Sequence, residues 1–321
     1  MQAILIEDRK LVWREAPEPE VTPGTVKIAV KASAVNRADL MQALGQYPPP
    51  PGASDVPGLE CSGEVVAVGE GVMRVAPGDS VCALLAGGGY AETVVAPAGQ
   101  VLRIPEGLGL LESAALPEVF ATAYLNLYGE AGLATGERVL LHAGASGVGT
   151  AAIQLCRESH NPCYVTVGSQ AKLERCIALG ASGGSNRHDG SFADNVAEWT
   201  HGEGFDVVLD PVGAPYLADN LASLRLDGRL ISIGLMGGAQ CELNLALLLM
   251  KRLRIVGSTL RPRGIAAKSA VMDGLKRDVW PKIEKGRIKP IIETVISMPE
   301  AQRAHELVAG NETVGKVLLE L

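Results

Sequence analysis

Three glycines between an apolar segment and a run of small residues are the clearest sign of chemistry in this sequence. Gly144, Gly147 and Gly149 follow the predicted strand 137–142, whose centre is Val-Leu-Leu, and precede the segment 150–156. Glycines let a backbone approach a pyrophosphate closely, and the N–H groups of a following helix hold the anion. The order G-x-x-G-x-G differs from the usual G-x-G-x-x-G, so a tight turn without a ligand is the alternative. The context of strand, turn and helix favours a dinucleotide site.

The identity of the dinucleotide is predicted from the end of the next strand. Residues 163–167 lie at the distance that a βαβ unit requires, and Gly168, Ser169 and Lys172 follow them. NAD enzymes usually end this strand with an acid, which would repel a 2′-phosphate, and no acid is present here. A hydroxyl at Ser169, a cation at Lys172 and Arg187, if its loop folds back, would form a phosphate cradle. Taken singly, the two cations are typical solvated surface residues, so the missing acid carries the prediction of NADPH.

The predicted secondary structure that positions these residues follows two different patterns along the chain. Up to about residue 116 the pattern is of short strands and turns, which predicts a mainly β unit, a distorted barrel. Beyond it, strands alternate with longer helical segments, which predicts a doubly wound parallel sheet. The tail contains a predicted helix, 266–285, and two short strands that rejoin the first unit. The sheet strands are predicted at 137–142, 163–167, 206–210, 229–233 and 253–257.

Composition limits the classes of partner. The chain has 321 residues, 47% of them hydrophobic, a net charge of −7 and no basic run, which argues against nucleic acid. The first residues lack the pattern of a signal peptide, and no apolar run is long enough to span a membrane. We therefore expect a cytoplasmic protein with no membrane partner. The six cysteines form no C-x-x-C pair, which predicts reduced thiols.

Several segments that match together resemble one superfamily. They are NRADLM at 36–41, GQYPPPPGA at 45–53, GLE at 58–60, LLAGGGYAE at 84–92, HAGASGVGTAAIQL at 142–155 and GLMGG at 234–238. They resemble the medium-chain dehydrogenase/reductase superfamily. Within it the sequence is most similar to the zinc-free NADPH quinone oxidoreductases of the zeta-crystallin type, particularly the branch of the tumour-suppressor-inducible quinone oxidoreductase. The resemblance covers nearly the whole chain.

The resemblance implies an α/β protein with two domains. A GroES-like β-barrel catalytic domain would comprise residues 1–121 and 265–321, and a doubly wound Rossmann domain that binds NADPH would comprise 122–264. The active site would lie in the cleft between them. Members of the family usually form homodimers through the edge strands of their Rossmann sheets, and 253–257 is the candidate edge here. An edge covered by a helix is the alternative.

The zinc alcohol dehydrogenases of this superfamily carry an early cysteine, a Gly-His-Glu motif and a four-cysteine lobe. This chain has Asn36 in the first region and reads Gly58-Leu59-Glu60 in the second. No cysteine lies between Cys82 and Cys156. Catalytic zinc requires three protein ligands, so we predict no metal.

Residue type and position suggest the substrate contacts, and the resemblance implies the cofactor contacts. Tyr47, beside a proline run, is the leading candidate to contact the substrate through its ring and hydroxyl, and Asn36 is the second, as an amide donor. A tyrosine packed on prolines and an asparagine in a structural turn are the alternatives. The remaining contacts implied for the cofactor are Ser146, Gly147, Val148 and Gly149 at the pyrophosphate, Thr122 and Gly234, Leu235, Met236 and Gly237 at the nicotinamide, and Lys316 in closing the cleft.

Quinone reduction is the activity that these features favour. A quinone is already electrophilic, so the protein has only to stack it near the nicotinamide, exclude water and supply a proton. Reduction of α,β-unsaturated carbonyls by the same metal-free site is an alternative, because one fold hosts many reactions. A non-catalytic NADPH-binding protein is another. The sequence does not reveal the natural acceptor, nor whether NADPH passes on a hydride or single electrons.

Overall fold

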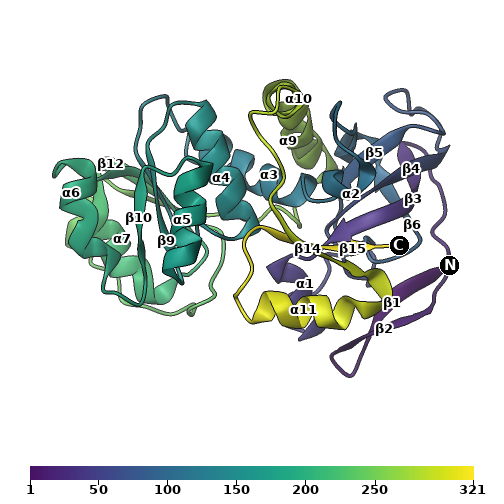
Figure 1. Cartoon of the computed structure of the whole chain (residues 1–321), viewed down its shortest axis with the longest axis horizontal. Helices are drawn as coiled ribbons and strands as arrows, with labels where there is room; N and C mark the ends of the chain where they lie inside the picture. Colours follow the sequence, from purple (N-terminus) through teal and green to yellow (C-terminus); the bar gives the residue numbers. More distant parts are fainter. The chain divides into compact units, whose positions relative to one another are not determined.

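The computed structural model describes all residues, 1–321. The chain forms two compact units, one comprising Met1–Ala121 with Leu260–Leu321 and the other Thr122–Thr259. In Figure 1 the first unit combines the purple N-terminal and the yellow C-terminal segments of the chain. No helix is both long enough and apolar enough to cross a membrane.

The first unit is built around a branched seven-stranded sheet in the order β14-β15-β3-β4-β5-β7. One edge of β3 pairs with β4, and the other pairs with β6 and with β15. The strands β1 and β2 form a separate antiparallel hairpin. The strands are β1 (Gln2–Glu7), β2 (Lys10–Glu15), β3 (Thr25–Ala34), β4 (Glu60–Val68), β5 (Ser80–Leu84), β6 (Thr93–Pro97), β7 (Val101–Arg103), β14 (Ile292–Ser297) and β15 (Lys316–Glu320).

Helices complete this unit. They are α1 (Arg37–Ala43), α2 (Leu110–Ser113), α9 (Ile265–Asp278), α10 (Trp280–Glu284) and α11 (Ala301–Ala309), together with the first residues of α3 (Pro117–Tyr124), which ends in the second unit. The single helix predicted at 266–285 is wrong, because two helices, α9 and α10, occupy this segment. Pro281 explains the break, since proline lacks an N–H and is tolerated only in the first turn of a helix. The apolar core includes Val26, Ile28, Val65 and Val81.

The second unit contains a fully parallel six-stranded sheet in the order β10-β9-β8-β11-β12-β13. Its strands are β8 (Val139–Leu141), β9 (Cys163–Val167), β10 (Gly183–Asn186), β11 (Phe205–Asp210), β12 (Leu224–Ser232) and β13 (Arg254–Gly257). Its helices are α4 (Gly147–Glu158), α5 (Gln170–Leu179), α6 (Val196–Thr200), α7 (Leu217–Ser223) and α8 (Leu245–Met250). In addition, α3 continues into a π-helical segment, Leu125–Glu130. The predicted doubly wound parallel sheet is confirmed.

The strand β10 was not predicted, because its sequence, Gly-Gly-Ser-Asn, has low strand propensity. It forms by pairing in register with β9. The strand order reverses between β8 and β11, and a parallel sheet binds ligands beyond the carboxyl ends of its strands at such a switch point. The fold therefore places the glycine turn after β8 at the expected end of the sheet.

Candidate active site

The glycine turn between β8 and α4 is closely packed. A Cβ on Gly144 would lie 2.6 Å from Cβ of Val165, and one on Gly149 would lie 2.4 Å from the carbonyl oxygen of Gly144. Ser146 is the N-cap of α4, and its Oγ accepts a hydrogen bond of 3.0 Å from the N–H of Gly149. The tight backbone path explains why glycine stands at both positions.

The first amides of α4 fit an anion. The N–H groups of Gly147 and Val148 have no protein acceptor, as is usual for the first turn of a helix. These donors, together with the positive end of the helix dipole, match the pyrophosphate of a dinucleotide. The local geometry therefore fits the predicted cofactor.

A second cluster lies where β9 ends. Ser169 is the N-cap of α5, and its Oγ accepts a hydrogen bond from the N–H of Lys172 at 3.3 Å. The guanidinium of Arg187, which follows β10, lies 3.7 Å from the position that a Cβ on Gly168 would occupy. Pairing of β10 with β9 thus brings Arg187 next to Gly168. A cation stands where NAD enzymes usually have an acid.

The loops after β11 and β12 are joined to each other. The N–H groups of Met236 and Gly237 donate to the carbonyls of Pro211 and Val212 at 3.1 and 2.7 Å, and Gly213 pairs with Gly238. These bonds fix the backbone of the loop, and the side chains of Leu235 and Met236 are exposed. Gly234 is the first residue of this loop, and a Cβ on it would lie 2.9 Å from the carbonyl oxygen of Pro211.

Thr122 lies on α3, and its carbonyl accepts a hydrogen bond of 2.8 Å from Nδ2 of Asn126.

In the first unit, three polar residues from distant segments form a buried cluster. The ammonium of Lys316 donates to the carbonyl of Val35 and to Oδ1 of Asn36, both at 2.7 Å, and pairs with Oε1 of Glu60 at 2.8 Å. The side chains of Lys316 and Glu60 are 4% and 0% exposed. An ammonium has three N–H donors, so all of those on Lys316 are used within this unit.

The same cluster occupies the amide of Asn36. Its Nδ2 donates to Oε1 of Glu60 at 2.9 Å and to the carbonyl of Ala34 at 3.2 Å. Oε2 of Glu60 accepts from the N–H of Glu118, 2.8 Å away, in the first turn of α3. The sequence analysis named Glu60 only as part of the Gly58-Leu59-Glu60 segment. No local pattern predicts its contacts with Asn36 and Lys316, which lie 24 and 256 residues away.

A buried proton-binding chain adjoins this cluster. Asp39 accepts from the N–H of Asn36 at 2.8 Å, from the N–H of Gly58 at 3.1 Å and from the hydroxyl of Tyr90 at 3.1 Å. Burial raises the pKa of Asp39 to about 6, although these hydrogen bonds and the charge of Lys316 oppose the shift. The Tyr90 hydroxyl also lies 3.3 Å from Nε2 of His305, whose pKa burial lowers to about 4. The sequence did not point to these residues.

Arg261 holds the segment that carries Tyr47. Its guanidinium carbon lies 5.3 Å from the centroid of the Tyr47 ring, and it donates to the Tyr47 carbonyl at 3.2 Å. It also donates to Oε1 of Gln42 at 2.6 Å and to the carbonyl of Ala86 at 2.8 Å. Burial raises the pKa of Tyr47, and the charge of Arg261 partly opposes this effect. No hydrogen bond joins Tyr47 to Asn36.

Two family models match the chain. Residues 22–106 match the model described as alcohol dehydrogenase GroES-like domain, and residues 147–273 match the one described as zinc-binding dehydrogenase. The human synaptic vesicle membrane protein VAT-1 homolog is 31% identical over 97% of this chain and 82% of its own length. The bovine quinone oxidoreductase-like protein 2 is 31% identical over 98% of this chain and 90% of its own length. The chain belongs to the medium-chain dehydrogenase/reductase superfamily.

A second group of relatives is much longer. The lovastatin diketide synthase of Aspergillus terreus is 38% identical over 68% of this chain, but the match spans only 9% of the synthase. A highly reducing polyketide synthase of Emericella nidulans is 36% identical over 67% of this chain and 8% of the synthase.

Solved structures share the fold along the full chain. The mycobacterial protein Rv1454c in complex with NADPH has a TM-score of 0.89 and 27% identity, with 100% of both chains covered. A quinone oxidoreductase of Pseudomonas syringae has a TM-score of 0.88 and 26% identity over 100% of this chain and 99% of the other. An NAD-dependent alcohol dehydrogenase has a TM-score of 0.86 and 30% identity, again over 100% of both. The GroES-like and Rossmann folds are thus those of this superfamily.

The donor set does not fit the zinc ion that one model's description names. No group of three or more His, Cys, Asp or Glu side chains is placed to hold a metal. Leu59 cannot bind zinc, and both carboxylate oxygens of Glu60 already accept hydrogen bonds from the protein. The residues present therefore do not fit a catalytic zinc ion.

Proposed function

We propose that this protein is an NADPH-dependent quinone oxidoreductase that works without zinc. The observation that carries the proposal is the position of Arg187 next to Gly168, with no acid at the end of β9. A cation at this position favours the 2′-phosphate of NADPH over the free ribose hydroxyls of NADH. The neighbours named as an NADPH complex and as a quinone oxidoreductase support the same assignment.

The cofactor contacts are proposed from the second unit. The amides of Gly147, Val148 and Gly149, together with Ser146, would bind the pyrophosphate, and Gly144 keeps the turn compact. Ser169, Lys172 and Arg187 would bind the 2′-phosphate, next to Gly168. Thr122 and the loop of Gly234, Leu235, Met236 and Gly237 would line the nicotinamide side. When bound, the nicotinamide supplies the hydride.

The acceptor contacts are proposed from the first unit. Tyr47 would stack on the quinone, and Arg261 holds the backbone of that loop in place. The reaction consumes one hydride and one proton, so the quinone becomes a hydroquinone and NADPH becomes NADP⁺. The Asn36, Glu60 and Lys316 cluster would act by positioning, because its donors are already used within the unit.

A second acceptor class has an observation in its favour. The polyketide synthase matches reach 38% identity, and one of these synthases is described as highly reducing. An α,β-unsaturated carbonyl would take the hydride at carbon, and the same metal-free site would serve it.

A screen of electron acceptors distinguishes quinone reduction from enone reduction. NADPH oxidation is followed with a simple quinone and with a small enone, with NADH in place of NADPH as the control. We expect turnover with the quinone. Turnover with the enone but not with the quinone would favour reduction of α,β-unsaturated carbonyls. Binding of NADPH without turnover of either acceptor would contradict both enzymatic functions.

We also propose a homodimer through β13. This strand lies at the edge of the parallel sheet, and Ile255 on it is exposed, as are Leu249 and Met250 in the preceding α8. An unpaired apolar edge favours pairing with another chain. Light scattering should give twice the mass of one chain, and Ile255→Lys should give monomers; a monomeric wild type would contradict the proposal.

A further inference from the structure

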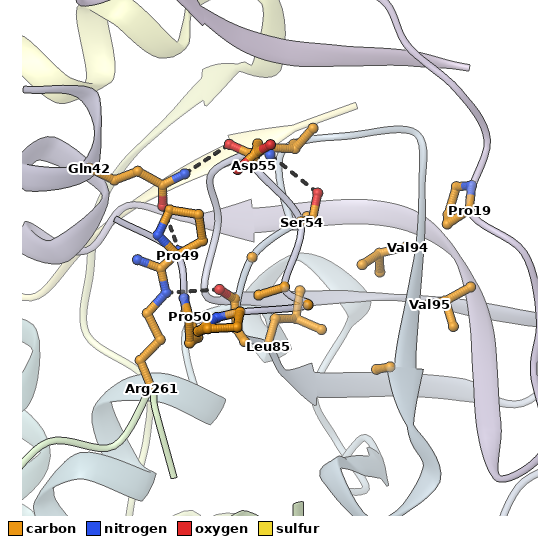
Figure 2. Close-up of a pocket in the computed structure, with 18 of the residues that line it drawn as sticks. Pro19, Gln42, Pro49, Pro50, Ser54, Asp55, Leu85, Val94, Val95 and Arg261 are labelled. Carbon is orange, nitrogen blue, oxygen red and sulfur yellow. Dashed lines mark hydrogen bonds between the residues drawn. The ribbon is translucent and has the colours of Figure 1, made fainter. Parts of the chain in front are cut away.

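The first unit contains a large cavity behind the proline loop that follows Tyr47. Its volume is about 1060 Å³, just above the usual range of small-molecule sites, roughly 300–1,000 Å³. Pro49, Pro50 and Leu85 form one side, and Val94 and Val95 of β6 form another, as Figure 2 shows. These walls suit a hydrocarbon.

The ionisable residues of the wall differ in burial according to the sign of their charge. The two acids, Glu7 and Asp55, are exposed, whereas the cations Arg261 and Lys268 are only 3% and 5% exposed. The third cation of the wall, Arg263, is half-buried. The buried part of the wall is therefore cationic and apolar, which complements an apolar anion.

Lys268 is poorly satisfied by the protein. Its ammonium makes one hydrogen bond, a long one of 3.2 Å to the carbonyl of Arg261. An ammonium has three donors, and a buried charge is costly unless it is paired and hydrogen-bonded. Burial lowers the pKa of Lys268, and the charge of Glu118, which is not part of the cavity wall, opposes this shift.

The start of α9 reaches the same cavity. Gly264 is its N-cap and provides no side-chain hydrogen bond, and both Gly264 and Ile265 line the cavity. The N–H groups of Ile265, Ala266 and Ala267 have no protein acceptor. A helix of 14 residues with a free first turn attracts a negative charge, and Lys268 lies in that turn.

We propose that this cavity binds a hydrocarbon chain that ends in a carboxylate, with the carboxylate at Lys268 and the first turn of α9. The chain lies against the prolines, Leu85 and β6. The site belongs to one unit and does not depend on the proposed reductase activity. Its occupant is a fatty-acid-like anion rather than a neutral quinone.

The test compares two probes with the same tail. Binding of decanoate and of decan-1-ol to the full chain is measured by titration calorimetry, without NADPH or quinone and below the concentration at which micelles form. We expect saturable binding of decanoate. Lys268→Met should weaken it by about tenfold or more, the effect of losing a charge-assisted hydrogen bond, and should leave decan-1-ol unchanged.

Two further variants make the result independent of misfolding. Lys268→Arg keeps the charge and should retain most of the decanoate affinity, and Val95→Trp should fill the cavity and weaken both probes. Circular dichroism and NADPH affinity report whether each variant is folded. Equal decanoate affinity in the wild type and in Lys268→Met, or no saturable binding to the wild type, would overturn the proposal. Suppose that inorganic phosphate displaces decanoate and that Val95→Trp does not change the affinity for decanoate. The site would then bind the anion but not the hydrocarbon chain, which also contradicts the proposal.

Discussion

The two units build their polar sites in opposite ways. In the second unit the proposed pyrophosphate site consists of backbone amides from a few consecutive residues, 144–149. In the first unit the cluster of Asn36, Glu60 and Lys316 consists of side chains from three distant segments. The first kind of site depends on how closely the backbone can pack, whereas the second depends on buried charges that satisfy one another. Substitutions should therefore act on the two through different physical effects.

The largest expected effect is the loss of the buried ion pair. Lys316→Met leaves the carboxylate of Glu60 buried without its cation, and breaking such a pair costs about 3–5 kcal/mol. The free energy of unfolding, from urea denaturation, measures it. The exposed pair of Arg14 and Glu7 provides the control, because Arg14→Met should cost less than about 1 kcal/mol. Similar losses in both variants would contradict the account of the cluster.

The next effect is the acid sensitivity that His142 confers on the second unit. Its two ring nitrogens lie 2.9 Å from Oγ1 of Thr166 and 2.6 Å from Oδ1 of Asn220. Burial lowers its pKa from 6.5 to about 4. The unfolded chain therefore takes up a proton first as the pH falls. The stability from this group is complete above pH 6.5, is lost as the pH falls from 6.5 to about 4, and changes little below that.

His142→Gln isolates this contribution. The wild type should lose up to about 3 kcal/mol relative to the variant between pH 7 and pH 4, at about 1.4 kcal/mol for each pKa unit. His305 acts in the same direction, and Asp39 acts in the opposite one, because its raised pKa favours the folded state when protonated. Urea denaturation at several pH values, with the exposed His160→Gln as the control, checks the sign. A difference between wild type and His142→Gln that does not change with pH would contradict it.

The glycine turn should respond to a single added methyl group. In Gly149→Ala the new Cβ would lie 2.4 Å from the carbonyl oxygen of Gly144, so the start of α4 must shift. We expect a loss of about 1–3 kcal/mol in stability and weaker NADPH binding. Gly310→Ala is the matched control, since the nearest atom lies 3.5 Å from its Cβ position, an ordinary van der Waals contact. Unchanged cofactor affinity in Gly149→Ala would remove the turn from the site.

The smallest expected effect concerns Tyr47. If its ring stacks on the acceptor, Tyr47→Phe should be almost silent in quinone kinetics, and Tyr47→Ala should raise KM. A hydroxyl that donates to the developing oxyanion would instead make Tyr47→Phe lower kcat. We expect stacking, because a quinone needs little acid assistance. Unchanged kinetics in both variants would exclude Tyr47 from the site.

The difference between the units also explains which features of the fold and of the candidate site could be predicted from the sequence. The glycine turn, the order of strands and helices in the Rossmann sheet and the missing acid are local patterns, so they were predictable. The strand β10 has no apolar pattern and exists because β9 supplies its partner. The contacts of Lys316 with Asn36 and Glu60 join residues up to 280 positions apart, and no spacing rule predicts them. Arg261 and Lys268 were missed for the same reason, because only the folded unit buries them.

The preference for NADPH over NADH is tested by the affinities of the double variant Lys172→Ala, Arg187→Ala for the two cofactors. We expect the variant to bind NADPH more weakly, by about 1.5–3 kcal/mol for each charge-assisted contact and less where the contact is exposed, whereas NADH binding should hardly change. Fluorescence titration of both cofactors measures the two affinities in the same preparation. Equal losses for NADPH and NADH would contradict the assignment of the 2′-phosphate site.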